Sequence, residues 1–218
     1  MNLQAILWDL DGVLIDTGEF HYQAWAATLA EFGIPYSREK FHATFGMNNL
    51  GTLTALLGHA PASELLTAVN EQKETAFRAS IRGQAAPLPG VVEWLERFKA
   101  QGLPQAVASS APPENIDALI DELHLRPYFA TLVSGASLPG KPDPAVFLTA
   151  ARQLNVAPTH CLVVEDSPAG VQAAQRAGMK CVAVLTTNPA HALSQADLIV
   201  ERLDLLARDH LTQIASLG

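Results

Sequence analysis

The chain has 218 residues, of which 49% are hydrophobic and 17% are charged. This length and composition suit an α/β domain with a smaller appendage, or one large domain, and they exclude an intrinsically disordered chain. The formal net charge of −8 argues against nucleic acids and anionic membranes as partners.

The sequence shows no sign of secretion or of membrane insertion. Asp9 and Asp11 interrupt the first apolar run, unlike a signal peptide, and no run approaches the roughly 18 apolar residues of a transmembrane helix. Cys161 and Cys181 lack the spacing of a zinc site or a redox pair, so we interpret them as reduced core residues. We therefore expect a soluble cytoplasmic protein, and a monomer, because no oligomer-specific pattern is present.

The first predicted element is a strand over Ala5–Trp8, and a different pattern follows it. Residues 17–86 contain no buried-strand run and predict helices only. These helices are expected at Glu19–Phe32, Ser37–Thr44, Asn48–Leu57 and Ser63–Ile81. The helical stretch ends at a turn segment, Pro87-Leu88-Pro89-Gly90, after which strands alternate with helices. The sequence thus predicts an all-helical cap domain, residues 17–86, inserted after the first strand.

The remainder of the chain alternates strands with helices. The further strands are predicted at Gln105–Ala108, Thr131–Val133, Cys161–Val164, Cys181–Leu185 and Leu198–Val200, and the helices at Val91–Ala100, Pro113–Leu123, Pro144–Leu154 and Pro168–Ala177. Continuous apolar runs are typical of parallel strands that are buried on both faces. We predict a doubly wound, mainly parallel, Rossmann-like α/β core from residues 1–16 and 87–218.

Two pairs of carboxylates follow predicted strands directly. Asp9 and Asp11 come after the first strand, and Glu165 and Asp166 come after the strand over Cys161–Val164. Each pair alone has a structural explanation, as a loop cap or as a helix N-terminal cap. Neighbouring ionised acids repel one another unless a cation or a shared proton relieves them. If the sheet brings the strand ends together, the four carboxylates therefore favour an oxygen-ligated cation, and Mg²⁺ fits best.

Two further groups complete the predicted site. Ser109 and Ser110 end a strand with hydroxyls, and Lys141 lies in the rigid turn Gly140-Lys141-Pro142-Asp143-Pro144. A hydroxyl and an ammonium together can hold a phosphoryl group and stabilise charge on its oxygens. A serine pair or a surface lysine would be weak evidence alone. The chain, however, has an acid pair, a hydroxyl, a lysine and a second acid pair in that order, each in or near a loop after a strand, and this combination favours phosphoryl transfer.

The order of these motifs resembles the haloacid dehalogenase-like superfamily. The residues that carry the resemblance are Asp9-Leu-Asp-Gly-Val-Leu-Ile-Asp-Thr17, the strand-end Ser109, Lys141-Pro-Asp-Pro144 and Glu165-Asp-Ser-Pro-Ala-Gly170. The stretch through Glu19-Phe20-His21 looks like the β-phosphoglucomutase-like branch, which has a small helical cap. The resemblance covers the whole chain.

The resemblance implies roles for individual residues. Asp9 would attack phosphorus and form an aspartyl-phosphate, while Asp11 would act as general acid and then as base. Asp9, Asp166 and the backbone carbonyl of Asp11 would bind Mg²⁺, with Glu165 as a further ligand or as a partner of the ligands. Ser109 and Lys141 would hold the transferring phosphoryl group.

The remaining candidates are substrate-binding residues, namely Gly12 of the first motif, Ser110, and the cap residues His21 and Asn49. His21 matches a residue of the branch that is thought to couple cap closure to Asp11, and the alternative is a surface histidine in a first helical turn.

The reaction has three open interpretations. A phosphatase acting on a small phosphorylated metabolite, such as a sugar or polyol phosphate, is favoured. A β-phosphoglucomutase-type mutase needs cations for a second phosphate, and this chain has Phe45, Asn49, Ala111 and Pro112 at the corresponding positions. The third is a non-catalytic protein that binds a phosphorylated ligand or a partner.

Overall fold

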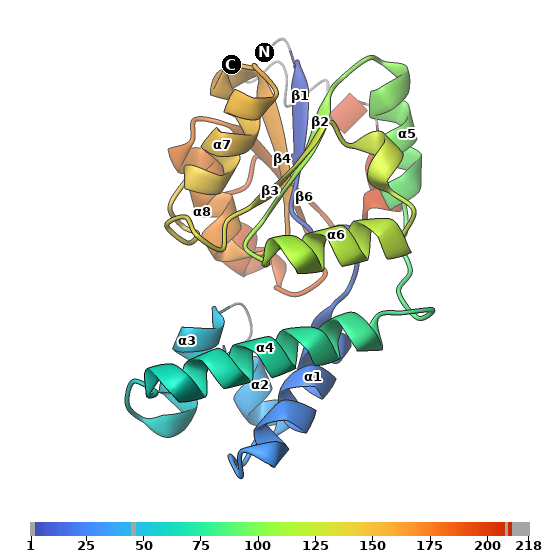
Figure 1. The fold of residues 1–218 in the computed structure, drawn as a ribbon. Coiled ribbons are helices and arrows are strands. Elements are labelled where there is room, and N and C mark those ends of the chain that lie inside the picture. Colours follow the sequence, from blue (N-terminus) through green and yellow to red (C-terminus); the bar gives the residue numbers. More distant parts are fainter. Residues whose placement is uncertain (1–2, 45–46, 208, 211–218) are drawn as a thin grey trace. The chain divides into compact units, whose positions relative to one another are not determined.

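The protein is described by a computed structural model over residues 3–44, 47–207 and 209–210, and the chain divides into two compact units (Figure 1). The core unit comprises residues 1–16 and 85–218, and the helical unit comprises residues 17–84. Each unit has its own cluster of buried apolar side chains.

The core unit is built on an open sheet of six strands that pair in parallel. The strands are β1 (Ala5–Trp8), β2 (Gln105–Ser109), β3 (Thr131–Ser134), β4 (Cys161–Glu165), β5 (Lys180–Val184) and β6 (Leu198–Val200). Their order across the sheet is β3-β2-β1-β4-β5-β6, which places β1 between β2 and β4. The α/β fold class predicted from the continuous apolar runs is confirmed.

Helices cover both faces of this sheet. They are α5 (Val91–Ala100), α6 (Pro113–Glu122), α7 (Ala145–Gln153) and α8 (Pro168–Arg176), with short 3₁₀ turns at Arg126–Tyr128, Pro158–His160, Ala190–Leu193 and Leu203–Leu205. Figure 1 shows α5 and α6 on one side of the sheet and α7 and α8 on the other. The α8 helix begins as its sequence predicts, because Ser167 caps it by accepting the N–H of Gly170 at 3.0 Å.

The two faces of the sheet are packed by different side chains. Successive residues of a strand point to opposite faces, so Leu7 and Trp8 of β1 enter separate clusters. Leu7 packs with Phe147 of α7, whereas the Trp8 ring lies 6.1 Å from the ring of Phe98, which in turn lies 5.3 Å from Trp94 of α5. Burial on both faces explains why β1 is apolar throughout.

The helical unit contains α1 (Gly18–Glu31), α2 (Arg38–Thr44), α3 (Asn49–Leu57) and α4 (Ser63–Ser80). The long helices α1 and α4 pack against each other. Their contact buries Trp25, Leu29 and Val69, together with Leu53 from α3. Among the residues that the structure describes, no helix is long and apolar enough to cross a membrane.

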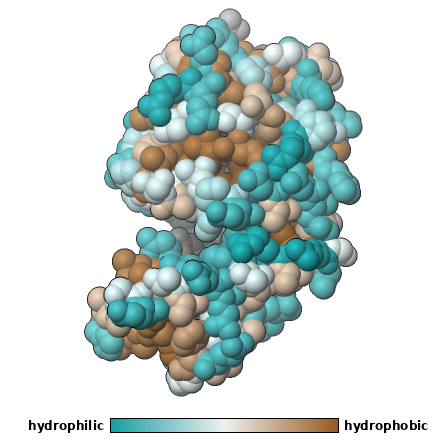
Figure 2. All heavy atoms as spheres, viewed as in Figure 1, coloured by the Kyte–Doolittle hydropathy of each residue, from teal (hydrophilic) through white to brown (hydrophobic). Residues whose placement is uncertain are grey.

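The surface of the core unit carries a groove of mixed polar and apolar lining beside the edge strand β3. Figure 2 shows apolar residues across the side of this unit where Figure 1 draws β3 and α6. The groove has a volume of about 310 Å³ and is lined by Pro113, Ile116, Asp117, Arg126, Phe129, Ala130, Thr131 and Leu132. None of these residues belongs to the predicted site, so we assign the groove no function.

Two glycines of the core unit provide a test of the packing. Gly90 has φ of +86°, and a Cβ added there would lie 2.2 Å from the backbone N of Asp204, whereas Gly102 has φ of +71° and open space around it. We expect Gly90→Ala to lower the free energy of unfolding by about 2–4 kcal/mol and Gly102→Ala by about 1 kcal/mol. Urea unfolding followed by circular dichroism measures both losses. Equal losses would contradict the close approach at Gly90.

Candidate active site

The acidic residues at the strand ends come from the neighbouring strands β1 and β4. Trp8 pairs with Val164, and the N–H of Asp9 donates to the carbonyl of Val164 at 3.0 Å. Asp9 therefore lies beside the point where Glu165 ends β4 and Asp166 follows. From β1 the strand order runs to β2 and β3 on one side of the sheet and to β4, β5 and β6 on the other. In open α/β sheets, ligands bind in the crevice at the carboxyl ends of the strands where the order changes direction in this way.

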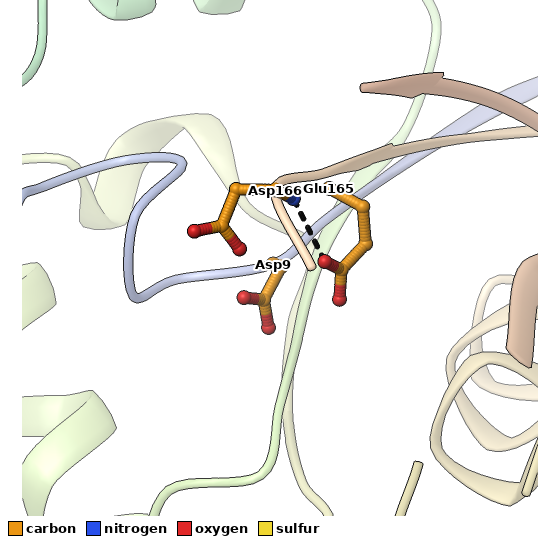
Figure 3. A group of neighbouring side chains, drawn as sticks. All are labelled: Asp9, Glu165 and Asp166. Atoms are coloured by element: carbon orange, nitrogen blue, oxygen red, sulfur yellow. Dashed lines mark hydrogen bonds between the residues drawn. The ribbon is translucent and has the colours of Figure 1, made fainter. Parts of the chain in front are cut away.

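Three carboxylates gather at this point. Oxygen atoms from Asp9, Glu165 and Asp166 lie within 4.8 Å of one another, and all three residues are buried. Figure 3 shows that the carboxylates of Glu165 and Asp166 leave the backbone in different directions. Buried carboxylates at this separation repel one another unless positive charge compensates them.

Lys141 supplies part of this positive charge. Its Nζ lies 2.7 Å from Oδ1 of Asp9 and 2.6 Å from Oε1 of Glu165, and its side chain is only 9% exposed. Burial alone would lower the pKa of Lys141, but attraction by Asp9 and Glu165 outweighs burial and raises the pKa. The lysine is therefore held in its charged form between two carboxylates.

Glu165 is bonded through both of its carboxylate oxygens. Oε1 accepts from Lys141, while Oε2 accepts from the backbone N–H groups of Asp166 and Ser167 at 2.8 Å each and from Oγ of Ser167 at 3.0 Å. The carboxylate also lies against α8, because a Cβ added to Gly170 would be 1.7 Å from Oε1. Gly170 thus leaves the space that Glu165 fills.

Asp166 is held by a loop that the sequence patterns did not single out. Oγ1 of Thr187 donates to Oδ2 of Asp166, and Nδ2 of Asn188 donates to the Asp166 carbonyl at 3.1 Å. Gly12, with φ of +77°, adjoins the same carboxylate oxygen, because a Cβ there would lie 1.9 Å from Oδ2. The one sequence signal for Thr187 and Asn188 is that polar residues follow the predicted strand over 181–185.

The crowding of these acidic residues alters their protonation. Burial raises the pKa of Asp9 to about 7 against the opposing effect of Lys141, and repulsion by Glu165 and Asp11 adds to the rise. Burial also raises the pKa of Asp166 well above its usual range, with repulsion from Glu165 and Asp9 adding to it. One lysine does not neutralise this group, so the group favours additional positive charge.

The free oxygens of the group suit a hard divalent cation. Within the described ranges, neither Oδ2 of Asp9 nor Oδ1 of Asp166 accepts a hydrogen bond from another side chain or from the backbone. Carboxylate oxygens without sulfur or imidazole ligands are the donor set that Mg²⁺ prefers. The residues present therefore fit the Mg²⁺ ion that the sequence predicts.

Asp11 lies in a tight turn immediately after Asp9. The N–H of Gly12 donates to the carbonyl of Ile15 at 2.7 Å, which closes this turn. Among the described residues, the acidic group within 4.8 Å does not include the Asp11 side chain, yet Asp11 is near enough to raise the pKa of Asp9. The side chain therefore lies close to Asp9 without belonging to the compact carboxylate group.

The serine pair ends β2, the other neighbour of β1. Ser109 is buried, and its Oγ accepts the N–H of Ala111 at 3.1 Å, a bond that does not use its own hydroxyl hydrogen. Oγ of Ser134 on β3 donates to the carbonyl of Ala111 at 2.6 Å and so fixes this loop. Ser110 is exposed.

The two candidates from the helical unit make contacts within that unit. His21 stacks on the ring of Phe77 with a centroid separation of 4.1 Å and an interplanar angle of 10°. Nδ2 of Asn49 donates to Oε1 of Glu74 at 2.9 Å. Phe45 lies outside the described residues. The substrate contacts of His21 and Asn49 remain predictions.

The family of the chain follows from comparison with known proteins. Residues 3–178 match the family model described as haloacid dehalogenase-like hydrolase. The chain therefore belongs to the haloacid dehalogenase-like hydrolase family, as its motifs predicted.

Relatives with known names include both phosphatases and mutases. The chain is 32% identical over 210 residues to β-phosphoglucomutase of Bacillus subtilis, covering 92% of this chain and 90% of that protein. It is 30% identical over 204 residues to the phosphorylated carbohydrates phosphatase of Thermotoga maritima, covering 90% and 93%. A structure of a mutant CbbY from Rhodobacter sphaeroides in complex with xylulose-(1,5)bisphosphate has a TM-score of 0.87 at 26% identity, covering 96% and 99%. The chain is thus an enzyme of the phosphatase and phosphotransferase class.

The contact between Gly170 and Glu165 generates a prediction for this enzyme. Gly170→Ala should displace the Glu165 carboxylate and with it Lys141, lowering kcat by about 10²-fold, because a shift near 1 Å has that effect on a catalytic group. Gly140→Ala is the matched control, since a Cβ at Gly140, directly before Lys141, meets no atom within 4 Å. Turnover of p-nitrophenyl phosphate measures both variants, and equal rates would argue against this contact.

Proposed function

We propose that this enzyme is a Mg²⁺-dependent phosphatase that hydrolyses a small phosphorylated sugar or polyol through an aspartyl-phosphate on Asp9. The observation that carries the proposal is the position of Lys141, which bridges Asp9 and Glu165 beside Asp166. An anionic nucleophile can approach a phosphate dianion only where positive charge offsets their repulsion. The likeness to the phosphorylated carbohydrates phosphatase of T. maritima supports the substrate class.

In the first step, a carboxylate oxygen of Asp9 forms a bond to phosphorus while the bond from phosphorus to the sugar oxygen breaks. Asp11 donates its proton to that leaving oxygen, so the sugar departs as a neutral alcohol. Ser109 donates a hydrogen bond to a phosphoryl oxygen, and Lys141 stabilises the charge on the transferring group.

In the second step, a water oxygen forms a bond to the phosphorus of the aspartyl-phosphate, and the bond to Asp9 breaks. Asp11, now ionised, accepts a proton from this water. Inorganic phosphate leaves, and the carboxylate of Asp9 and the acid form of Asp11 are restored.

The cation has a defined place in this proposal. The side chains of Asp9 and Asp166 and the backbone carbonyl of Asp11 would hold Mg²⁺, which when bound supplies charge that offsets the repulsion between nucleophile and phosphate. Glu165 has both oxygens bonded, so we assign it to holding Lys141 in place rather than to the metal.

The second candidate function is that of a sugar phosphomutase, which the 32% identity to the B. subtilis β-phosphoglucomutase favours. A mutase would pass the phosphoryl group from Asp9 to a second hydroxyl and must hold a phosphate at each end of its intermediate. Ala111 and Pro112 supply no cation for this purpose, and the neutral amide of Asn49 is bonded to Glu74. These residues favour the phosphatase.

Replacement of the nucleophile tests the mechanism. We expect Asp9→Asn to lower kcat for p-nitrophenyl phosphate by roughly 10⁴-fold or more, because an amide does not attack phosphorus. Asp121→Asn, in an exposed ion pair with Arg126, should leave the rate unchanged. Assays with Mg²⁺ and after chelation belong to the same experiment. Turnover that persists in Asp9→Asn, or without Mg²⁺, would contradict the mechanism.

A product assay separates the two candidate functions. We expect a panel of sugar and polyol phosphates to include at least one that releases inorganic phosphate. Incubation of β-glucose 1-phosphate with a trace of its bisphosphate gives the comparison. Formation of glucose 6-phosphate there, with no phosphate release from the panel, would support the mutase.

A further inference from the structure

We propose that Thr187 is a positioning residue that fixes the carboxylate of Asp166 so that only Oδ1 binds the cation, and that this arrangement favours Mg²⁺ over Ca²⁺. The inference rests on the proposed function, because it takes Asp166 as a metal ligand.

The two oxygens of Asp166 have different surroundings. Oδ2 accepts the hydroxyl hydrogen of Thr187 and occupies the space that a Cβ of Gly12 would need, with 1.9 Å between the two positions. The methyl carbon of Thr187 lies 3.1 Å from the same Cβ position, so Gly12 and Thr187 adjoin each other around Oδ2. In the part of the chain that the structure describes, Oδ1 accepts no hydrogen bond, so it is the Asp166 oxygen left for a cation.

Asn188 directs the hydroxyl of Thr187 toward the carboxylate. Nδ2 of Asn188 donates to Oγ1 of Thr187 at 2.9 Å and to the backbone carbonyl of Asp166 at 3.1 Å. A hydroxyl has one hydrogen to donate, and its oxygen here accepts from the amide. The Asp166 carbonyl lies 3.4 Å from Oγ1, and Oδ2 is the nearer acceptor for that hydrogen. The loop after β5 therefore holds Asp166 by its side chain and by its backbone.

A carboxylate held in this way discriminates between cations. Ca²⁺ takes 6–8 oxygen ligands at roughly 2.3–2.6 Å and often binds a carboxylate through both oxygens, whereas Mg²⁺ takes six near-octahedral ligands at about 2.0–2.1 Å. Asp166 offers one oxygen because Thr187 occupies the other, and both oxygens of the adjacent Glu165 are bonded. Oδ1 of Asp9 accepts from Lys141, so Asp9 also offers one oxygen. Among the described residues, the three carboxylates of this group therefore offer no two-oxygen ligand of the kind that Ca²⁺ prefers.

Metal binding by the full chain tests this inference directly. Dissociation constants for Mg²⁺ and for Ca²⁺ are measured by calorimetry on the wild type, Thr187→Val, Thr187→Ser and Thr186→Val. Valine keeps the shape of threonine without the hydroxyl, serine keeps the hydroxyl, and Thr186 is the adjacent threonine, which does not bond to Asp166 in the described structure. Thr187 is exposed, so its replacement should leave the fold intact.

We expect Thr187→Val to weaken Mg²⁺ binding by about 10–100-fold, as loss of a hydrogen bond to a metal ligand typically does, and to weaken Ca²⁺ binding by less than about threefold. The preference for Mg²⁺ should therefore fall about tenfold or more. Thr187→Ser and Thr186→Val should keep both constants within about threefold of the wild type. The inference would be overturned if Thr187→Val changed neither dissociation constant, or changed those for Mg²⁺ and Ca²⁺ by the same factor. It would also be overturned if Thr187→Ser weakened Mg²⁺ binding as much as Thr187→Val does.

Asp166→Ala separates this inference from the proposed function. If Asp166→Ala abolishes Mg²⁺ binding and turnover while Thr187→Val changes neither constant, the positioning role alone is wrong. If Asp166→Ala leaves Mg²⁺ binding intact, the metal site of the proposed function is wrong, and the role of Thr187 is overturned with it.

Discussion

The ion pairs of Lys141 with Asp9 and Glu165 are the interaction on which the site depends. They join β1, β4 and the turn before α7, three segments that are far apart in the sequence. Desolvation of several charges is costly, and mutual attraction offsets this cost only where the geometry is good and the remaining lone pairs are bonded. The four hydrogen bonds to Glu165 meet that condition. Oδ2 of Asp9 accepts no hydrogen bond within the described ranges, which leaves it for the proposed reaction.

Two glycines leave the space in which the carboxylates of Asp166 and Glu165 lie against the neighbouring backbone. Gly12 makes room for Oδ2 of Asp166, and Gly170 makes room for Oε1 of Glu165. A side chain at either position would displace a carboxylate rather than a flexible surface group. The glycines of the first and last motifs therefore have a steric role beside the acidic residues to which we assign the chemistry.

Much of the fold and part of the site could be predicted from the sequence. Continuous apolar runs located the strands, and because parallel strands end at one edge, Asp9, Glu165, Asp166 and Lys141 were expected together. The role of Glu165 stayed open in the sequence, since it depends on the direction of one side chain. Thr187 was missed because its partner is set by the pairing of β4 with β5, which no local pattern encodes.

The place of β1 in the sheet has a consequence for how the chain folds. This strand precedes the other five strands of the sheet in the chain, yet its neighbours on the two edges begin only at Gln105 and Cys161. Until β2 and β4 have been synthesised, both edges of this apolar strand are unpaired, and the strand is open to pairing with other chains. The helical unit, whose residues are contiguous, can complete its own contacts during this interval. The order of the chain therefore allows the inserted helices to fold before the six-stranded sheet can close.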